Sequence, residues 1–339
     1  MTLPPQFQPV GSNAERQDLP WAIPALIVAF SFLTVYCTYV AIHAKDVQTG
    51  IVYADRSLAD YRLALEGARE FPYQWRLLGV YLVYAGERLT GFDPNAIDVV
   101  IKSVLLSISS FILFAFSLTY VSRLGALCAV AFYWLLNVAA FTDGYYIYYT
   151  NDYAMVAAWF GAVYAVRSGR YGIAAALTLV GSLAKETMML VPILLAAGYL
   201  RKRVPPGAVV LAGLAFLVPT AFLRLTYRAP IGKWAWWDMV FTNVPFLQSS
   251  LHELLLTLKN NAKVALFFNV LWLLGARGVA RAAHPFVKDL AITLVIYLLL
   301  AYPVIYIREL RHFLPLAILL LPIGLSELDR PRSWTPGPA

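Results

Sequence analysis

The sequence predicts an all-α, polytopic integral membrane protein with about ten transmembrane helices and with amphipathic surface helices in its first outer loop. Of its 339 residues, 60% are hydrophobic and only 14% are charged, whereas a soluble domain carries about 25% charged residues. Apolar segments recur from Trp21 to Leu325, and no polar stretch between them is longer than the first loop. A bilayer can cover this much apolar surface and one water-soluble core cannot, so we expect a single membrane domain over residues 1–339.

The first element is a retained transmembrane helix. Residues 1–19 are polar, and the apolar run from Trp21 to His43 is about as long as a full span, which is too long for the core of a cleavable signal peptide. The net charge of +8 is attributed to cytoplasmic Lys and Arg, so no nucleic-acid partner is expected. Cys37 and Cys128 lie in apolar runs and are interpreted as buried small hydrophobes rather than a disulfide or a metal pair.

Ten apolar segments follow one another along the chain. Arg123, Arg167/Arg170, Arg201–Arg203 and Arg277/Arg281/Lys288 lie in the connectors between them. An arrangement with both termini in the cytoplasm places all of these connectors on the cytoplasmic side, as the positive-inside rule requires. The segments are 20–43, 97–120, 124–141, 153–167, 171–184, 187–200, 205–226, 262–276, 287–307 and 310–326.

The stretch 171–200 is apolar except for Lys185 and Glu186. As one helix it would be about 45 Å long, against a hydrocarbon core of about 30 Å. A hairpin of two short helices keeps the basic connectors at both its ends on one side of the membrane. We therefore expect a turn at Lys185-Glu186 on the outer side.

The first outer loop, residues 44–97, contains two predicted surface helices. From Arg56 to Glu70, apolar residues recur every three or four positions, and Arg56/Asp60 form an i,i+4 pair on another face. A second helix runs from Gln74 to Leu89. On the predicted topology most of the Asp and Glu residues of the chain lie on this outer side, so the outer face is expected to carry the chemistry.

Asp55 and Asp60 are the candidate catalytic residues of this loop. Each is either an ordinary helix-start charge or a general base or metal-binding carboxylate at the membrane surface. Asp60 has Arg56 as a partner in the helix. Asp55 precedes the predicted helix and has no such partner, so it is the first choice.

Three further segments carry candidate phosphate-binding residues. Arg76 lies among aromatic residues and either extends its charge to the interface or clamps a lipid phosphate. Lys185 and Glu186 form either a wetted turn or a phosphate contact with its orienting acid. Arg308 and Arg311 lie on the outer side against the positive-inside trend, which favours binding of an anionic headgroup over pairing with nearby acids.

The supporting candidates are Asp143, Asp152 and His312. The two aspartates bracket a tyrosine-rich outer loop. They are either part of an ordinary interface loop or help to hold a divalent cation or sugar hydroxyls. His312 alone indicates nothing specific.

Together these features resemble the GT-C superfamily of polyprenyl-phosphate-dependent membrane glycosyltransferases, in particular its poorly characterised bacterial members. The resemblance covers residues 20–326 and has four parts: a first helix followed by a large outer loop with an early acid, the Phe71–Leu78 segment, the Lys185-Glu186-Thr187 turn and the late Arg308-Glu309-Leu310-Arg311 segment. The chain departs from the pattern in two respects, because Asp55 is followed by Arg56 rather than by a second acid, and no sizeable C-terminal soluble domain is present.

The resemblance implies a multi-pass protein of the bacterial cytoplasmic membrane that works in cell-envelope assembly, with its site facing the outside or the periplasm. It implies a polyprenyl-phosphate-linked sugar as donor, a glycan, lipid or protein as acceptor, and membrane lipids as the surroundings. Asp55 or Asp60 would be the base, and the lipid phosphate would be bound by Arg76, Lys185, Arg308 and Arg311. A divalent cation is a possible cofactor, and the resemblance leaves this question open. The alternatives are a transporter or lipid flippase, for which no inverted repeat is found, and a non-catalytic membrane subunit.

Overall fold

The computed structural model describes residues 21–49, 53–66, 76–142, 149–226, 244, 250–302 and 309–329. The described residues form helices and turns without any strand, which confirms the all-α prediction. The helices are α1 (Ala22–Thr49), α2 (Tyr53–Leu65), α3 (Leu78–Thr90), α4 (Pro94–Ser117), α5 (Arg123–Thr142), α6 (Thr150–Arg167), α7 (Tyr171–Ser182), η3 (Glu186–Met189), α8 (Leu190–Leu200), α9 (Pro206–Thr226), α11 (Leu251–Phe268), α12 (Leu271–Arg281), α13 (Pro285–Ala301), η5 (Leu310–Leu316) and α14 (Ala317–Ser326).

Within the described residues, four helices are long and apolar enough to cross a membrane, namely α1, α4, α5 and α9. The bent pair of α11 and α12 raises this number to five if the pair is one span. The expected number of about ten spans is therefore not confirmed. Three further segments that were predicted as spans are shorter apolar helices, at Tyr171–Ser182, Glu186–Leu200 and Leu310–Ser326. The predicted spans 153–167 and 287–307 coincide with α6 and α13, which are not among the helices long and apolar enough to cross.

The predicted span 262–276 is interrupted, and it falls in the bent pair of α11 and α12. The chain breaks at Asn269, which has a φ of 46°, and the axes of α11 and α12 differ by 58°. Asparagine adopts positive φ more readily than most residues, so it suits a break inside an apolar run. After the break α12 packs against α14, and a Cβ atom on Gly278 would lie 2.7 Å from the backbone oxygen of Ile323.

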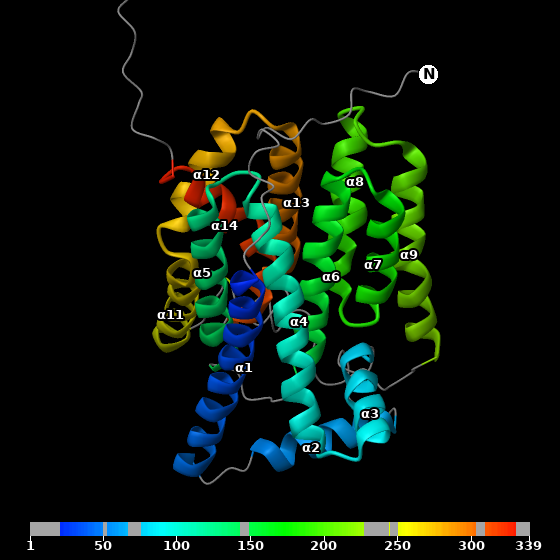
Figure 1. Cartoon of the computed structure of the whole chain (residues 1–339), viewed down its shortest axis with the longest axis vertical. Helices are drawn as coiled ribbons and strands as arrows, with labels where there is room; N and C mark the ends of the chain where they lie inside the picture. Colours follow the sequence, from blue (N-terminus) through cyan, green and yellow to red (C-terminus); the bar gives the residue numbers. More distant parts are fainter. Residues whose placement is uncertain are drawn as a thin grey trace, which may run out of the picture.

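The predicted hairpin within 171–200 is confirmed. Helix α7 ends at Ser182, and the backbone oxygen of Leu183 accepts hydrogen bonds from Leu77 and Leu78 at the end of the bundle that carries α3. After α8, Arg201 lies 3.2 Å from Asp289 near the start of α13, at the opposite end. Figure 1 shows α6, α7, α8 and α9 side by side in green.

The two surface helices of the first loop lie at one end of the bundle (Figure 1). Tyr61 of α2 is buried against Val80 and Val83 of α3 and donates a hydrogen bond of 2.9 Å to Glu87. Burial and this bond raise the pKa of Tyr61 above its usual range. Helix α2 begins at Tyr53, so Asp55 lies in its first turn rather than before it, and the predicted separation of Asp55 from the helix is wrong.

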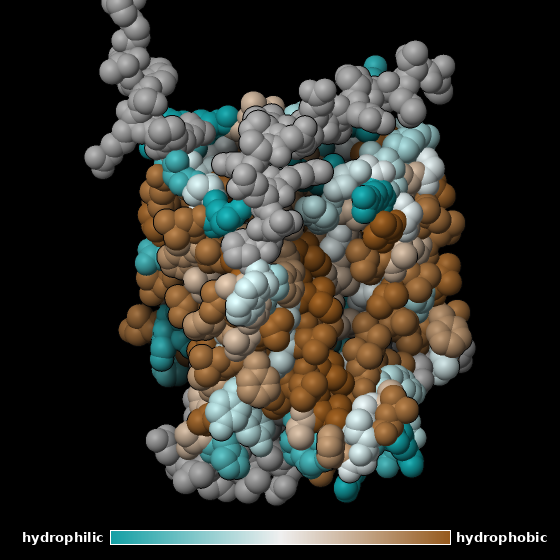
Figure 2. All heavy atoms as spheres, in the orientation of Figure 1, coloured by the Kyte–Doolittle hydropathy of each residue, from teal (hydrophilic) through white to brown (hydrophobic). Residues whose placement is uncertain are grey.

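The outer surface of the bundle suits a bilayer. Apolar side chains cover the middle of the face shown in Figure 2, and polar side chains gather toward its two ends. Cys37 and Cys128 are free and exposed on this surface, so the expectation that they are buried is wrong.

We call the end that carries α2, α3, Lys185 and the start of η5 the network end, and the end that carries Arg167, Arg203 and Arg281 the basic end. The charges of Arg167 and Arg203 both act on His284, which places these connectors together. The basic end is the one that the positive-inside rule assigns to the cytoplasm.

Candidate functional site

The candidate site is built around Asp152, in the first turn of α6. Its Oδ1 atom accepts a hydrogen bond of 2.5 Å from Nζ of Lys185, and its Oδ2 atom accepts one of 2.8 Å from Nη1 of Arg311. All three side chains are at most 4% exposed. One carboxylate thus pairs with two cations that come from segments distant in the sequence.

Arg311 has two further partners that fix its position. Its Nη2 atom donates to Glu309 over 2.6 Å, and its guanidinium carbon lies 3.4 Å from the centre of the Tyr149 ring. An arginine stacked on an aromatic face gains a cation–π interaction. Arg311 is therefore held on both sides by carboxylates and on one face by a ring.

His312 joins Lys185 to Glu309. Its Nδ1 atom lies 3.1 Å from Nζ of Lys185, and its Nε2 atom lies 3.1 Å from Oε2 of Glu309. Because an ammonium group has only donors, Nδ1 accepts and Nε2–H donates to Glu309. The hydrogen bonds thus assign a neutral His312 with its proton on Nε2.

Arg76 and Glu186 form the more exposed edge of this network. Nη2 of Arg76 lies 3.5 Å from Oε2 of Glu186, and the side chains are 14% and 32% exposed. This distance is long for a charge-assisted hydrogen bond, which is usually 2.7–2.9 Å. The Arg76–Glu186 pair is therefore the contact of the network that a competing anion separates most easily.

The backbone next to Arg76 is bound directly to α6. The side chain of Asn151 donates to the backbone oxygen of Arg76 over 3.0 Å and accepts from the backbone nitrogen of Gly79 over 2.7 Å. A Cβ atom on Gly79 would lie 2.6 Å from the backbone nitrogen of Asn151. Glycine is needed at this position for α3 to approach α6 so closely, and this approach sets Arg76 beside Asp152.

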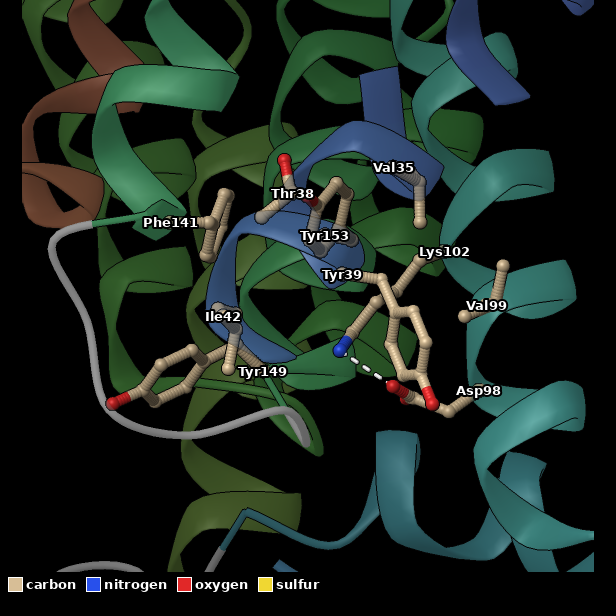
Figure 3. Close-up of a pocket in the computed structure, with 10 residues that line it drawn as sticks. All are labelled: Val35, Thr38, Tyr39, Ile42, Asp98, Val99, Lys102, Phe141, Tyr149 and Tyr153. Carbon is tan, nitrogen blue, oxygen red and sulfur yellow. Dashed lines mark hydrogen bonds and ion pairs between the residues drawn. The ribbon is translucent and has the colours of Figure 1, made fainter. Parts of the chain in front are cut away.

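A second buried ion pair, between Asp98 and Lys102, lies at the start of α6 near Asp152. Asp98 of α4 accepts a hydrogen bond of 2.5 Å from Lys102 and another from the hydroxyl of Thr150, at the start of α6. Beside the pair is a cavity of about 20 Å³, which has room for about one water molecule. Figure 3 shows Lys102 and Asp98 joined at this cavity, with Tyr39 of α1 next to them.

Two groups in the connecting segments of the network have shifted pKa values. Burial lowers the pKa of Lys185 to about 8, although Asp152 opposes this change. Burial would raise the pKa of Glu309, but Arg311 and His312 hold it below its usual range. Lys185 therefore loses its charge near pH 8, whereas Glu309 stays ionised at any neutral pH.

The network itself offers neither a free base nor a metal site. Asp152 and Glu309 are occupied by cations, and the described part of the chain contains no group of three or more His, Cys, Asp and Glu side chains that could hold a metal ion. The arrangement fixes three cationic side chains at the network end, and Arg76 is the most exposed of them.

Six of the sequence-predicted residues lie together in this network, namely Arg76, Asp152, Lys185, Glu186, Arg311 and His312. Asp143 and Arg308 lie outside the described residues. The backbones of Asp55 and Asp60 are in α2, but their side chains are outside the described part.

Asp98 and Lys102 were given no role from the sequence, and acids such as Glu309 were considered only as pairing partners for Arg308 and Arg311. Asp98 and Lys102 are four residues apart at the start of an apolar run. This spacing was the signal that could have found them, because two opposite charges on one face of a membrane helix pair readily.

No family model matches the chain, and no curated protein or solved structure matches it either.

Proposed function

We propose that this protein is a membrane glycosyltransferase of the GT-C type, which transfers a sugar from a polyprenyl-phosphate donor to a glycan, lipid or protein acceptor on the non-cytoplasmic side. The observation that carries the proposal is the gathering of Arg76, Lys185 and Arg311 at one end of the bundle. The same end carries the surface helix α2, whose sequence includes Asp55 and Asp60 (Figure 1).

In this proposal the three cations have different tasks. Lys185 and Arg311 are buried on Asp152 and hold the site in shape. Arg76 is the residue that meets the phosphate, because it is more exposed than the other two cations and its ion pair with Glu186 is long. A guanidinium binds a phosphate with two parallel hydrogen bonds, which gives orientation as well as affinity.

Glu186 is the resting counter-ion of Arg76. When the lipid phosphate arrives, it replaces the Glu186 carboxylate on the guanidinium, and Glu186 turns toward water. The net charge of the network then stays balanced, because one anion leaves as another arrives. The lipid tail remains in the bilayer while its headgroup meets Arg76.

The proposed chemistry is transfer at the anomeric carbon of the sugar. The carboxylate of Asp55 or Asp60 takes the proton of the acceptor hydroxyl, the acceptor oxygen forms a bond to the anomeric carbon, and the bond from that carbon to the phosphate oxygen breaks. Polyprenyl phosphate leaves with the bonding electrons. General-base help of this kind is worth about 10²–10⁴-fold in rate.

The alternative function is transport of a lipid or solute across the membrane. Transporter sites lie near the midplane and are open to the two sides in turn. Here the ion pairs gather at the two ends, with the Asp152 network at one and Arg201, Arg203 and Asp289 at the other. This separation favours a site at one membrane surface.

The experiment is a donor-turnover assay with the purified full-length protein in proteoliposomes. Radiolabelled hexose and pentose donors on polyprenyl phosphate are supplied together with an extract of bacterial envelope glycans and lipids as acceptor. We expect release of polyprenyl phosphate by the wild type and its loss in Arg76→Gln. Equal turnover in wild type and Arg76→Gln would contradict the assignment of the phosphate contact.

A further inference from the structure

A second recess lies far from the network, between α12 and α13. Its volume is about 490 Å³, and it is open on one side. Ligand pockets in proteins are usually about 300–1,000 Å³, so the recess is large enough to hold part of a ligand.

The wall of the recess is almost wholly apolar. Val279 and Ala280, at the end of α12, form one side, and α13 forms the other side with Ala291, Ile292, Val295 and Ile296. The α13 residues repeat at steps of three and four, so they form one stripe along the helix. The stripe is about 12 Å long from Lys288 to Ile296, at 1.5 Å per residue. Such a wall fits a hydrocarbon chain and offers little to a polar solute.

Lys288 is the one polar side chain among the described residues that line the recess. It lies one turn inside the start of α13, at the mouth of the recess on the basic end, and it is exposed. Asp289 beside it is buried and is bound by Arg201 and Arg203.

Two further carboxylates at this end are also occupied. Asp329 accepts hydrogen bonds from the backbone nitrogen and the hydroxyl of Ser122. Glu327 accepts from Arg281 over 3.0 Å and lies 3.2 Å from Arg277. The described acids of this region therefore do not neutralise Lys288. Its charge faces the place where the headgroups of one leaflet lie.

We propose that this recess binds an anionic phospholipid of the leaflet at the basic end, with one acyl chain along α13 and its phosphate on Lys288. An apolar recess with a cation at its mouth matches the two parts of such a lipid. Basic pockets between membrane helices on the cytoplasmic side bind anionic headgroups in the same way. The site is separate from the proposed glycosyltransferase site and does not depend on it.

The proposal is tested by native mass spectrometry of the full-length protein, released from nanodiscs that contain equal amounts of phosphatidylglycerol and phosphatidylcholine. We expect the wild type to retain phosphatidylglycerol in preference to phosphatidylcholine. In Lys288→Ala this retention falls about five-fold, since one cation near the headgroups contributes about that factor. Lys288→Arg keeps the preference.

Two further variants make the result specific. Val295→Trp fills the recess and lowers retention of phosphatidylglycerol although Lys288 is intact, whereas Arg170→Ala, an exposed cation of the same end that does not line the recess, leaves it unchanged. Equal retention of the two lipids by the wild type, or no change in Lys288→Ala, would overturn the proposal. A dimer that disappears in Val295→Trp would also overturn it, because a second copy of the chain would then be the occupant.

Discussion

The exchange of Glu186 for a lipid phosphate on Arg76 leads to a prediction of opposite sign for two neighbouring residues. Glu186→Gln removes the competing carboxylate, so the affinity of the site for a polyprenyl phosphate should rise. Arg76→Gln removes the binding group itself, so the affinity should fall. If the Arg76–Glu186 pair only stabilised the structure, both substitutions would change the affinity for the phosphate in the same direction.

The structure sets the expected size of each effect. The pair is partly exposed and 3.5 Å long, and exposed ion pairs are worth about 0–1 kcal/mol. Glu186→Gln should therefore tighten binding by at most about five-fold, since 1.4 kcal/mol is a factor of ten. The loss of a hydrogen bond to a charged group costs about 1.5–3 kcal/mol, so Arg76→Gln should weaken binding by about 10–150-fold.

The assay is equilibrium binding of farnesyl phosphate to the purified full-length protein in detergent, followed by intrinsic tryptophan fluorescence. Farnesol, which has the same chain without the phosphate, is the control ligand, and all variants should bind it equally. Weaker phosphate binding in Glu186→Gln would refute the exchange and would make Glu186 a residue that positions Arg76.

Three further predictions follow from the same geometry. Because burial lowers the pKa of Lys185 to about 8, the site loses positive charge as the pH rises from 7 to 9. The affinity for farnesyl-phosphoryl-glucose, whose phosphodiester charge is constant over this range, should therefore fall in the wild type but not in Lys185→Arg. An affinity of the wild type that does not change with pH would contradict the role of Lys185 as a cation of the site. Asp152→Asn leaves two buried cations without their shared carboxylate, so the free energy of unfolding in an SDS titration should drop by about 3–5 kcal/mol. A drop below about 1 kcal/mol, the range of an exposed ion pair, would show that the network is solvated. In a background without native cysteines, Phe92→Cys should react with an impermeant thiol reagent on intact cells and Ser168→Cys only after permeabilisation, whereas the reverse pattern would invert the predicted topology.

The sequence predicted the character of the fold well, because hydropathy and the positive-inside rule act on segments rather than on single residues. The turn at Lys185 is a clear case, since a 30-residue apolar run with charges in its middle does not fit one crossing. The break at Asn269 was missed because it interrupts an apolar stretch without any change in composition. The expected number of about ten spans is not confirmed, because short apolar helices such as α7 and α8 have the hydropathy of a span without its length.

The sequence predicted several residues of the candidate site but not the contacts that join them. Arg76, Lys185 and Arg311 stood out because charges near a membrane are costly. That Asp152 binds two of them, and that Asn151 ties α3 to α6, depends on contacts between residues that are 33 to 159 positions apart, which no local pattern encodes. Asp98 and Lys102 were missed because the pair neutralises itself within one helix and leaves no excess charge in the sequence.

The most direct test of the proposed function is donor turnover in proteoliposomes by the wild type, Asp55→Asn, Asp60→Asn and the double variant. We expect release of polyprenyl phosphate from a labelled hexose or pentose donor by the wild type, with sugar appearing in the acceptor extract, and a loss of about 10²–10⁴-fold in whichever single variant removes the base. The double variant should insert and elute normally but remain inactive. Full turnover in the double variant would remove the acids of α2 from the reaction, and no release from any donor by the wild type, in the presence of tight farnesyl phosphate binding, would contradict the glycosyltransferase itself.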